Sequence, residues 1–124
     1  MLSSFGEQFG LARELALRVA GAFGGGMARM GETCGAVTGA LMAIGLKYGM
    51  TQAKDEAARE KTYKLAQEFM TRFKARHNSL VCRELLGYDL STSEGRKGAY
   101  EKGLFTTLCP QLVRDAVEIL DQML

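Results

Sequence analysis

Apolar residues recur at every third or fourth position along most of the chain, which is the spacing of amphipathic α-helices. The first stripe consists of Phe5, Phe9, Ala12, Ala16, Val19 and Phe23, and the glycines Gly24–Gly26 follow it. A second segment, from about Thr33 to Tyr48, is apolar on nearly all sides, which predicts a helix buried at the centre of the fold. Val and Ile are few while Ala and Leu are abundant, so a β-sheet is disfavoured.

Four further helices follow from the same pattern. A long one is predicted over about Gln52–His77 and a short one over Leu80–Leu86. A polar one follows the turn Asp89–Glu94, with a Ser or Thr of that turn as its N-cap. The last begins near Pro110, the only proline, which suits the first turn of a helix. No repeat, linker or domain boundary is visible in the sequence. The predicted fold class is therefore all-α: a single compact helical bundle of about five to six helices that covers residues 1–124.

Composition and charge narrow the classes of function. The apolar share of 47% and the charged share of 24% are those of an ordinary globular domain. A net charge of +2 is too small to favour nucleic acid or an anionic membrane as a partner. No secretory signal is visible in residues 1–12, and the apolar run Ala36–Leu46 is too short to span a bilayer. These features predict a cytoplasmic protein that contacts neither membrane nor nucleic acid.

The candidate chemistry lies in three cysteines. Cys34 begins the apolar helix among small residues that allow another backbone to approach closely, and Cys109 directly precedes Pro110. The amide groups and dipole of a helix N-terminus favour a thiolate, so these two thiols are expected to have a lowered pKa. Three thiols near helix ends, with Cys82 in the short helix, suit a redox pair or a metal site. The alternative is that they only pack, because no Cys-x-x-Cys motif is present.

Other residue types give weaker signals. His77 would complete a three-Cys-one-His zinc set, but a histidine at a helix C-terminus that interacts with the helix dipole is the simpler interpretation. Gly24–Gly26 lacks the spacing of a phosphate-binding loop and is interpreted as a tight connection between helices. Arg83 would add positive potential beside Cys82, although a surface salt bridge is the expected role for it.

A set of segments resembles the C_GCAxxG_C_C family, to which a redox role is ascribed. The shared segments are Gly24-Gly25-Gly26, the core Cys34-Gly35-Ala36 with Gly39, Val81-Cys82-Arg83-Glu84, and Leu108-Cys109-Pro110. The resemblance implies a helical fold and a redox or metal-binding role. The family is named for four cysteines, and the one without a counterpart here would fall a few residues ahead of Met1.

Two hypotheses follow for the function. In the first, Cys34, Cys82 and Cys109 converge on one site, with Cys34 as the activated thiol and the other two as resolving thiols or metal ligands. This site would exchange with a redox partner that the sequence does not name, or would hold an iron–sulfur cluster or another thiolate-bound metal, incomplete with three cysteines. In the second, the chain is a non-catalytic interaction module that forms a homodimer, and the cysteines only pack.

Overall fold

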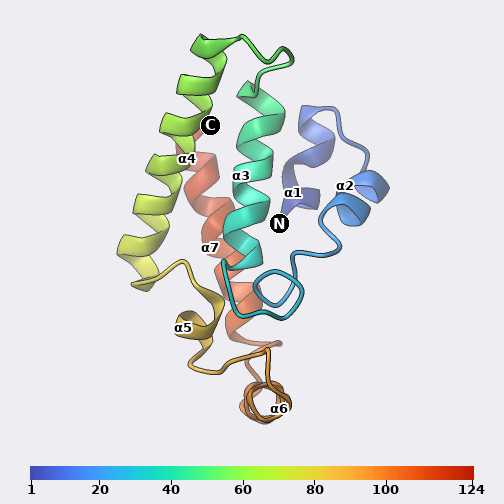
Figure 1. Ribbon diagram of the computed structural model, residues 1–124, viewed down its shortest axis with the longest axis vertical. Coiled ribbons are helices and arrows are strands. Elements are labelled where there is room, and N and C mark those ends of the chain that lie inside the picture. Colours follow the sequence, from blue (N-terminus) through green and yellow to red (C-terminus); the bar gives the residue numbers. More distant parts are fainter.

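The computed structural model describes all 124 residues and contains seven α-helices and one 3-10 helix (Figure 1). The longest helices, α3 (Gly35–Tyr48), α4 (Glu56–His77) and α7 (Leu108–Met123), lie side by side and contact one another. The N-terminal helix α1 (Leu2–Gly6) packs against α3 on its other side, and α2 (Arg13–Val19) lies beyond α1. Two short helices, α5 (Cys82–Leu86) and α6 (Ser93–Glu101), form one end of the molecule.

The all-α class is confirmed, with no strand and a single isolated β-bridge. The helix count exceeds the predicted five to six because the N-terminal stripe does not form one helix. Gly10 adopts a left-handed conformation (φ 90°) after the 3-10 helix η1 (Glu7–Phe9), so the chain turns there and α2 starts separately. Phe5 and Ala16 of the stripe are buried, but Val19 is 57% exposed.

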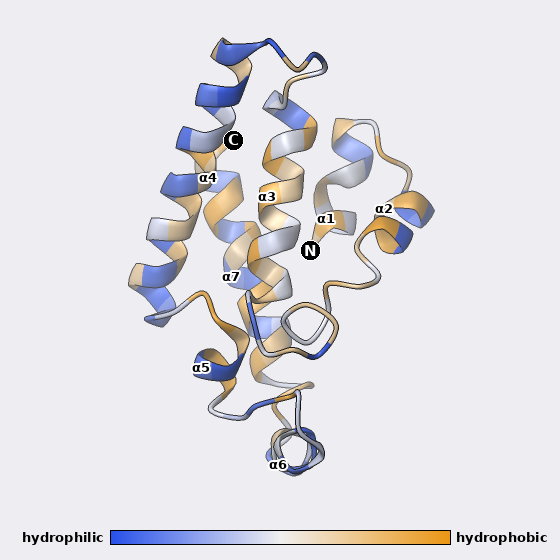
Figure 2. Ribbon diagram, viewed as in Figure 1, coloured by the Kyte–Doolittle hydropathy of each residue, from blue (hydrophilic) through white to orange (hydrophobic).

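The helix α3 is the central element, as its uniform hydropathy predicts. Figure 2 shows few hydrophilic residues along α3, whereas α4 is strongly hydrophilic on the side turned away from it. Gly39 allows a close neighbour, as the small-residue pattern predicts. A Cβ on Gly39 would lie 2.6 Å from the Met1 Cβ and 3.1 Å from the Leu2 amide nitrogen.

The long helix α4 begins at Glu56, four residues later than predicted, because Asp55 accepts a hydrogen bond from the Ala58 amide and caps it (3.1 Å). It ends where expected, at Asn78, which adopts a left-handed conformation (φ 68°). None of the helices combines the length and the hydropathy needed to cross a bilayer.

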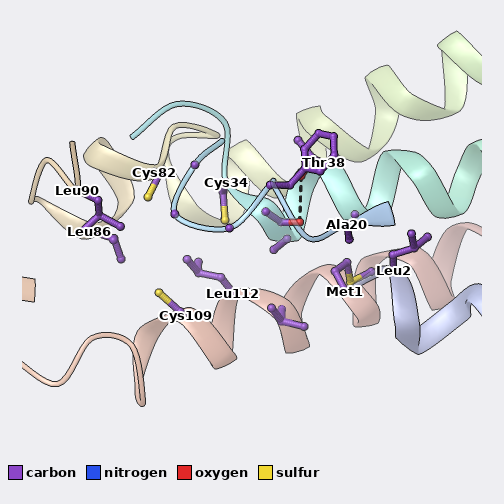
Figure 3. Close-up of a pocket in the computed structure, with 18 of the residues that line it drawn as sticks. Met1, Leu2, Ala20, Cys34, Thr38, Cys82, Leu86, Leu90, Cys109 and Leu112 are labelled. Carbon is purple, nitrogen blue, oxygen red and sulfur yellow. Dashed lines mark hydrogen bonds between the residues drawn. The ribbon is translucent and has the colours of Figure 1, made fainter. Parts of the chain in front are cut away.

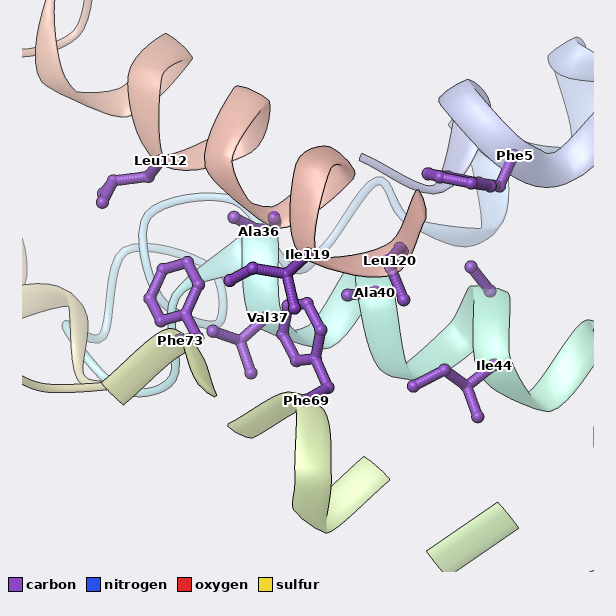
Figure 4. Packing of buried hydrophobic residues seen from close by; sticks show 12 residues of the cluster. Phe5, Ala36, Val37, Ala40, Ile44, Phe69, Phe73, Leu112, Ile119 and Leu120 are labelled. Atoms are coloured by element: carbon purple, nitrogen blue, oxygen red, sulfur yellow. The ribbon is translucent and has the colours of Figure 1, made fainter. Parts of the chain in front are cut away.

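Phenylalanines of α4 form the centre of the main core. Phe69 and Phe73 are fully buried, with ring centroids 5.9 Å apart, and they extend toward α3 and α7 (Figure 4). The main core comprises Phe5, Ala36, Val37, Ala40, Ala43, Ile44, Phe69, Phe73, Leu112, Ala116, Ile119 and Leu120. A smaller core of Cys82, Leu86, Leu90 and Ala99 joins α5 to α6.

The glycines of α6 have a packing role that the sequence does not reveal. The Thr92 side chain accepts a hydrogen bond from the Gly95 amide (2.9 Å), as the predicted N-cap should. A Cβ on Gly95 would collide with the Asp89 carbonyl, and a Cβ on Gly98 would collide with the Tyr88 ring. Glycine lowers the helix propensity at these two positions, but it allows α6 to pack tightly against the turn before it.

Candidate functional site

All three cysteine side chains line one cavity of about 350 Å³. Figure 3 shows the sulfurs of Cys34, Cys82 and Cys109 directed into the same space from three separate segments. Cys34 is the N-cap of α3, Cys82 is the first residue of α5, and Cys109 is the second residue of α7. All three are free thiols. The fold thus brings together sulfurs that are far apart along the chain.

A short backbone pairing aligns Cys34 with Cys82. Thr33 and Val81 form an antiparallel β-bridge, flanked by hydrogen bonds from the Cys34 amide to the Leu80 carbonyl (2.8 Å) and from the Cys82 amide to the Glu32 carbonyl (2.6 Å). Successive side chains of an extended chain point to opposite faces. Cys34 and Cys82 are each one residue from the bridge, so both side chains lie on the face opposite Thr33 and Val81.

A left-handed turn brings the chain to this bridge. Five consecutive residues, Gly25–Arg29, have positive φ angles between 52° and 69°. For the three that are not glycine, this conformation costs about 1–2 kcal/mol each. Neither the length of this turn nor its handedness follows from the glycine run alone, which is why the sequence predicts only a tight connection. Strain of this kind is concentrated at functional segments.

Gly26 in that turn is in close contact with Cys82. It is buried, its φ is 69°, and a Cβ there would lie 2.5 Å from the Cys82 Cβ and 2.7 Å from the Glu32 amide nitrogen. Only glycine fits such a position without moving the backbone. The turn therefore fixes how far Cys82 extends toward the cavity.

The cavity lies where the two hydrophobic cores meet. Ala36 and Leu112 of its lining belong to the main core, and Cys82, Leu86 and Leu90 belong to the smaller one. No charged side chain lines it. The thiols consequently face a space of low polarity.

This environment favours protonated thiols. Burial raises the pKa of Cys34, although the backbone amides of Ala36 and Val37 act in the opposite direction. Burial, followed by the charges of Cys34, Cys109 and Asp89, raises the pKa of Cys82 to about 11, and burial and then the charge of Cys34 raise the pKa of Cys109. The prediction of a lowered pKa for Cys34 and Cys109 is therefore wrong, because desolvation outweighs the helix N-terminus.

The protein family described as "Putative redox-active protein (C_GCAxxG_C_C)" matches residues 1–123. The chain belongs to this family. No curated protein and no solved structure matches the chain. For this family member, the cavity is the place where the cysteines of the three matching segments meet.

We expect Cys82 to be alkylated slowly in the folded protein. A pKa of about 11, against an ordinary 9.0, lowers the thiolate fraction at pH 8 by about 100-fold, and only the thiolate attacks iodoacetamide. Peptide mapping after a timed pulse of iodoacetamide, with and without urea, measures the ratio of the Cys82 alkylation rates in the unfolded and the folded protein. A similar rate in both conditions would show that the folded environment does not hold the proton.

The same shift makes folding stability depend on pH. Between pH 9 and 11 the unfolded thiol loses its proton while the folded thiol keeps it, so stability must fall as pH rises through this window. Urea unfolding at the two ends of the window should show a smaller loss for Cys82→Ala than for the natural chain. The difference between the two proteins isolates the effect of Cys82, because lysines and tyrosines titrate in both and contribute equally to the loss of stability.

His77 and Arg83 lie outside the cavity. His77 Nε2 is 2.9 Å from Asp115 Oδ2, and its ring packs on Phe73. Gln111 donates a hydrogen bond to the other oxygen of Asp115 (2.8 Å), so this buried carboxylate joins α4 to α7. Arg83 pairs with Glu32 at the surface (3.5 Å), as expected. The sequence gives no sign of the buried role of Asp115, which occupies a position next to the apolar stripe of α7.

The thiols do not fit a metal or an iron–sulfur cluster as this chain is folded. A cluster needs several thiolates on common iron atoms. No group of three or more His, Cys, Asp or Glu side chains is arranged to hold a metal ion.

Proposed function

We propose that this protein undergoes reversible thiol–disulfide exchange at the cysteine cavity, with Cys34 as the attacking thiol. The observation that carries the proposal is the meeting of three free thiols, from three distant segments, at one cavity. Membership of a family described as redox-active supports it. An apolar cavity of this size, within the range of small-molecule sites, also supports an exchange with a small partner.

Cys34 is the best candidate for the attacking thiol for two reasons. It is the one thiol of the three at which backbone amides oppose the effect of burial. Its charge also contributes to the raised pKa of both other thiols, which is expected of a sulfur near both. Cys82 is the proposed resolving thiol because the β-bridge carries it on the same face as Cys34.

The exchange has two steps. Cys34 loses its proton, its thiolate attacks a small disulfide, a mixed disulfide forms, and the small thiolate that leaves takes up a proton in place of the one that Cys34 lost. Cys82 then attacks the Cys34 sulfur and releases the second small thiol. In sum, two protein thiols and one external disulfide become one protein disulfide and two external thiols, with two electrons passing to the external reagent.

Closing this disulfide requires a small movement. Diagonal neighbours on an antiparallel pair are about 7–8 Å apart, with Cβ atoms somewhat closer, whereas a disulfide needs Cβ atoms about 3.5–4.5 Å apart. The segment that carries Cys82 must therefore shift toward α3, which opens the bridge between Thr33 and Val81 and moves Cys82 relative to Gly26.

Counting free thiols in a redox buffer tests the proposal. After equilibration with oxidised dithiothreitol, trapping with an alkylating reagent and intact-mass analysis, we expect the natural chain to lose two of its three thiols. Cys34→Ser should lose none, and Cys109→Ser should lose both that remain. Unchanged exchange in Cys34→Ser would refute the assignment, and reduction should restore every thiol in the natural chain.

The homodimer hypothesis has one observation in its favour. Leu15, Leu17 and Val19 of α2 are 49%, 54% and 57% exposed, so this helix presents apolar surface. If Cys34→Ser alters stability alone while sedimentation gives a concentration-dependent dimer, the interaction module becomes the better account.

A further inference from the structure

A second hollow, of about 700 Å³, adjoins the cysteine cavity. Gly24, Gly25, Leu90 and Phe105 line both spaces, and Leu90 is visible beside the sulfurs in Figure 3. We call the second space the arginine recess, because Arg29 and Arg96 line it. A small molecule that entered the cavity from this side would contact the recess first.

The recess is positively charged without internal compensation. Arg29 and Arg96 are its only charged lining residues, and no carboxylate lines it. Neither arginine forms an ion pair, whereas Arg72, Arg76 and Arg83 each pair with a carboxylate. Arg96 donates one hydrogen bond from Nη1 to the Leu90 carbonyl (2.9 Å), which leaves its other donors free.

The backbone fixes Arg29 at this position. Arg29 is the last residue of the left-handed turn, and its amide donates to the Gly24 carbonyl (3.1 Å). The ideal Cβ position of Gly25 is 2.9 Å from the Arg29 Cα, so the turn is tightly closed. The strained left-handed backbone of the turn thus holds the Arg29 side chain next to Gly25, which lines both the recess and the cavity.

The remaining lining suits an aromatic or apolar group next to an anion. Tyr100 and Phe105 are 77% and 40% exposed, and both line the recess. A guanidinium group offers a planar fork of donors that matches the oxygens of a carboxylate or a phosphate. No charged side chain lines the cavity beyond, so a ligand would place its oxyanion in the recess and its apolar portion toward the thiols.

We propose that the arginine recess binds the oxyanion of the small molecule that the cavity thiols act on, which makes an anionic, low-molecular-weight disulfide the substrate class. The inference about the substrate rests on the proposed thiol exchange, whereas the anion site itself does not. In this exchange the anionic disulfide accepts two electrons and leaves as two anionic thiols, while two cavity thiols of the protein become one disulfide.

Binding is tested with a probe that cannot exchange. The dianionic thioether 4,4′-thiodibenzoate is titrated into the full chain by calorimetry, with phenyl phosphate as a second arm and the neutral 4,4′-thiodibenzamide as a third. Arg29→Gln and Arg96→Gln should each weaken the binding of the anion by about tenfold. Arg72→Gln, a matched change on the outer face of α4, should bind as the natural chain does.

The outcomes separate the sources of the oxyanion. Tighter binding of the thiodibenzoate assigns a carboxylate, and tighter binding of phenyl phosphate assigns a phosphate. Equal affinity for the anions and the neutral amide, or no loss in either recess variant, would overturn the proposal. The affinity of the natural chain should also fall in about 0.5 M NaCl, a test that needs no variant.

Exchange kinetics separate failure of this proposal from failure of the thiol function. The anionic 5,5′-dithiobis(2-nitrobenzoate) should react with the natural chain several-fold faster than with either recess variant, while neutral 4,4′-dithiodipyridine should react equally with all. Loss of anion selectivity with exchange intact would refute only the recess. Anion binding without formation of a protein disulfide would refute only the thiol function.

Discussion

Gly26→Ala is expected to destabilise the reduced protein by about 3 kcal/mol, since a non-glycine residue would be both strained at this φ and in collision with its neighbours. The new methyl group would overlap the Cys82 Cβ and the backbone of Glu32, so the β-bridge should open. Urea unfolding in the presence of reductant measures the change. The iodoacetamide rate at Cys82 should rise in the same variant, because the thiol becomes accessible.

Gly24→Ala is the matched control for this change. Gly24 precedes the left-handed turn, is exposed, and has no atom within 4 Å of an added Cβ. We expect its stability to stay within about 0.5 kcal/mol of the natural chain. Equal effects at Gly24 and Gly26 would mean that the turn is not closed against Cys82 in solution.

Phe69→Ala is expected to cost about 3–5 kcal/mol, the loss typical of a buried aromatic side chain replaced by a methyl group. Phe69 is fully buried between α4, α3 and α7, and its ring stacks on Phe73. The variant would therefore lose contacts that hold the helices bearing Cys34 and Cys109. The midpoint of urea unfolding, followed by circular dichroism, gives the free-energy difference.

Tyr63→Ala on the same helix controls for helix propensity. Tyr63 is 54% exposed, so its removal should cost much less than the loss of Phe69. A small effect at Phe69 would show that the core rearranges to fill the space.

The fold was predictable where the hydrophobic pattern of a segment keeps a single helical phase from its start to its end. Segments such as α3 and α4 have patterns that local hydropathy determines, and their predicted limits agree with the structure to within a few residues. The prediction of one helix over the N-terminal stripe is wrong because the spacing of three and four residues continues across Gly10. Gly10 adopts a left-handed conformation, and the chain turns there. The periodicity of apolar residues shows which side chains are expected to be buried. It cannot reveal a turn when the apolar residues on both sides of the turn keep the same spacing.

The candidate site was predictable in its residues and not in its electrostatics. The resemblance pointed to Cys34, Cys82 and Cys109, and the fold brings them to one cavity, although their roles remain predictions. The sign of the pKa shift depends on how deeply each sulfur is buried relative to nearby amides, which is a three-dimensional quantity. Arg29 and Arg96 gave no sequence signal, because 66 intervening residues separate two arginines that meet only in the folded chain.

The pairing of residues 31–34 with residues 80–83 has a consequence for chain entropy. A covalent link between Cys34 and Cys82 would enclose α3 and α4 in a loop of about 48 residues, and a loop of this length restricts the unfolded chain by about 4 kcal/mol. Oxidation at the cavity would thus stabilise α3 and α4, the two helices inside this loop, against unfolding. The redox state of two sulfurs would then set how readily the entire bundle denatures.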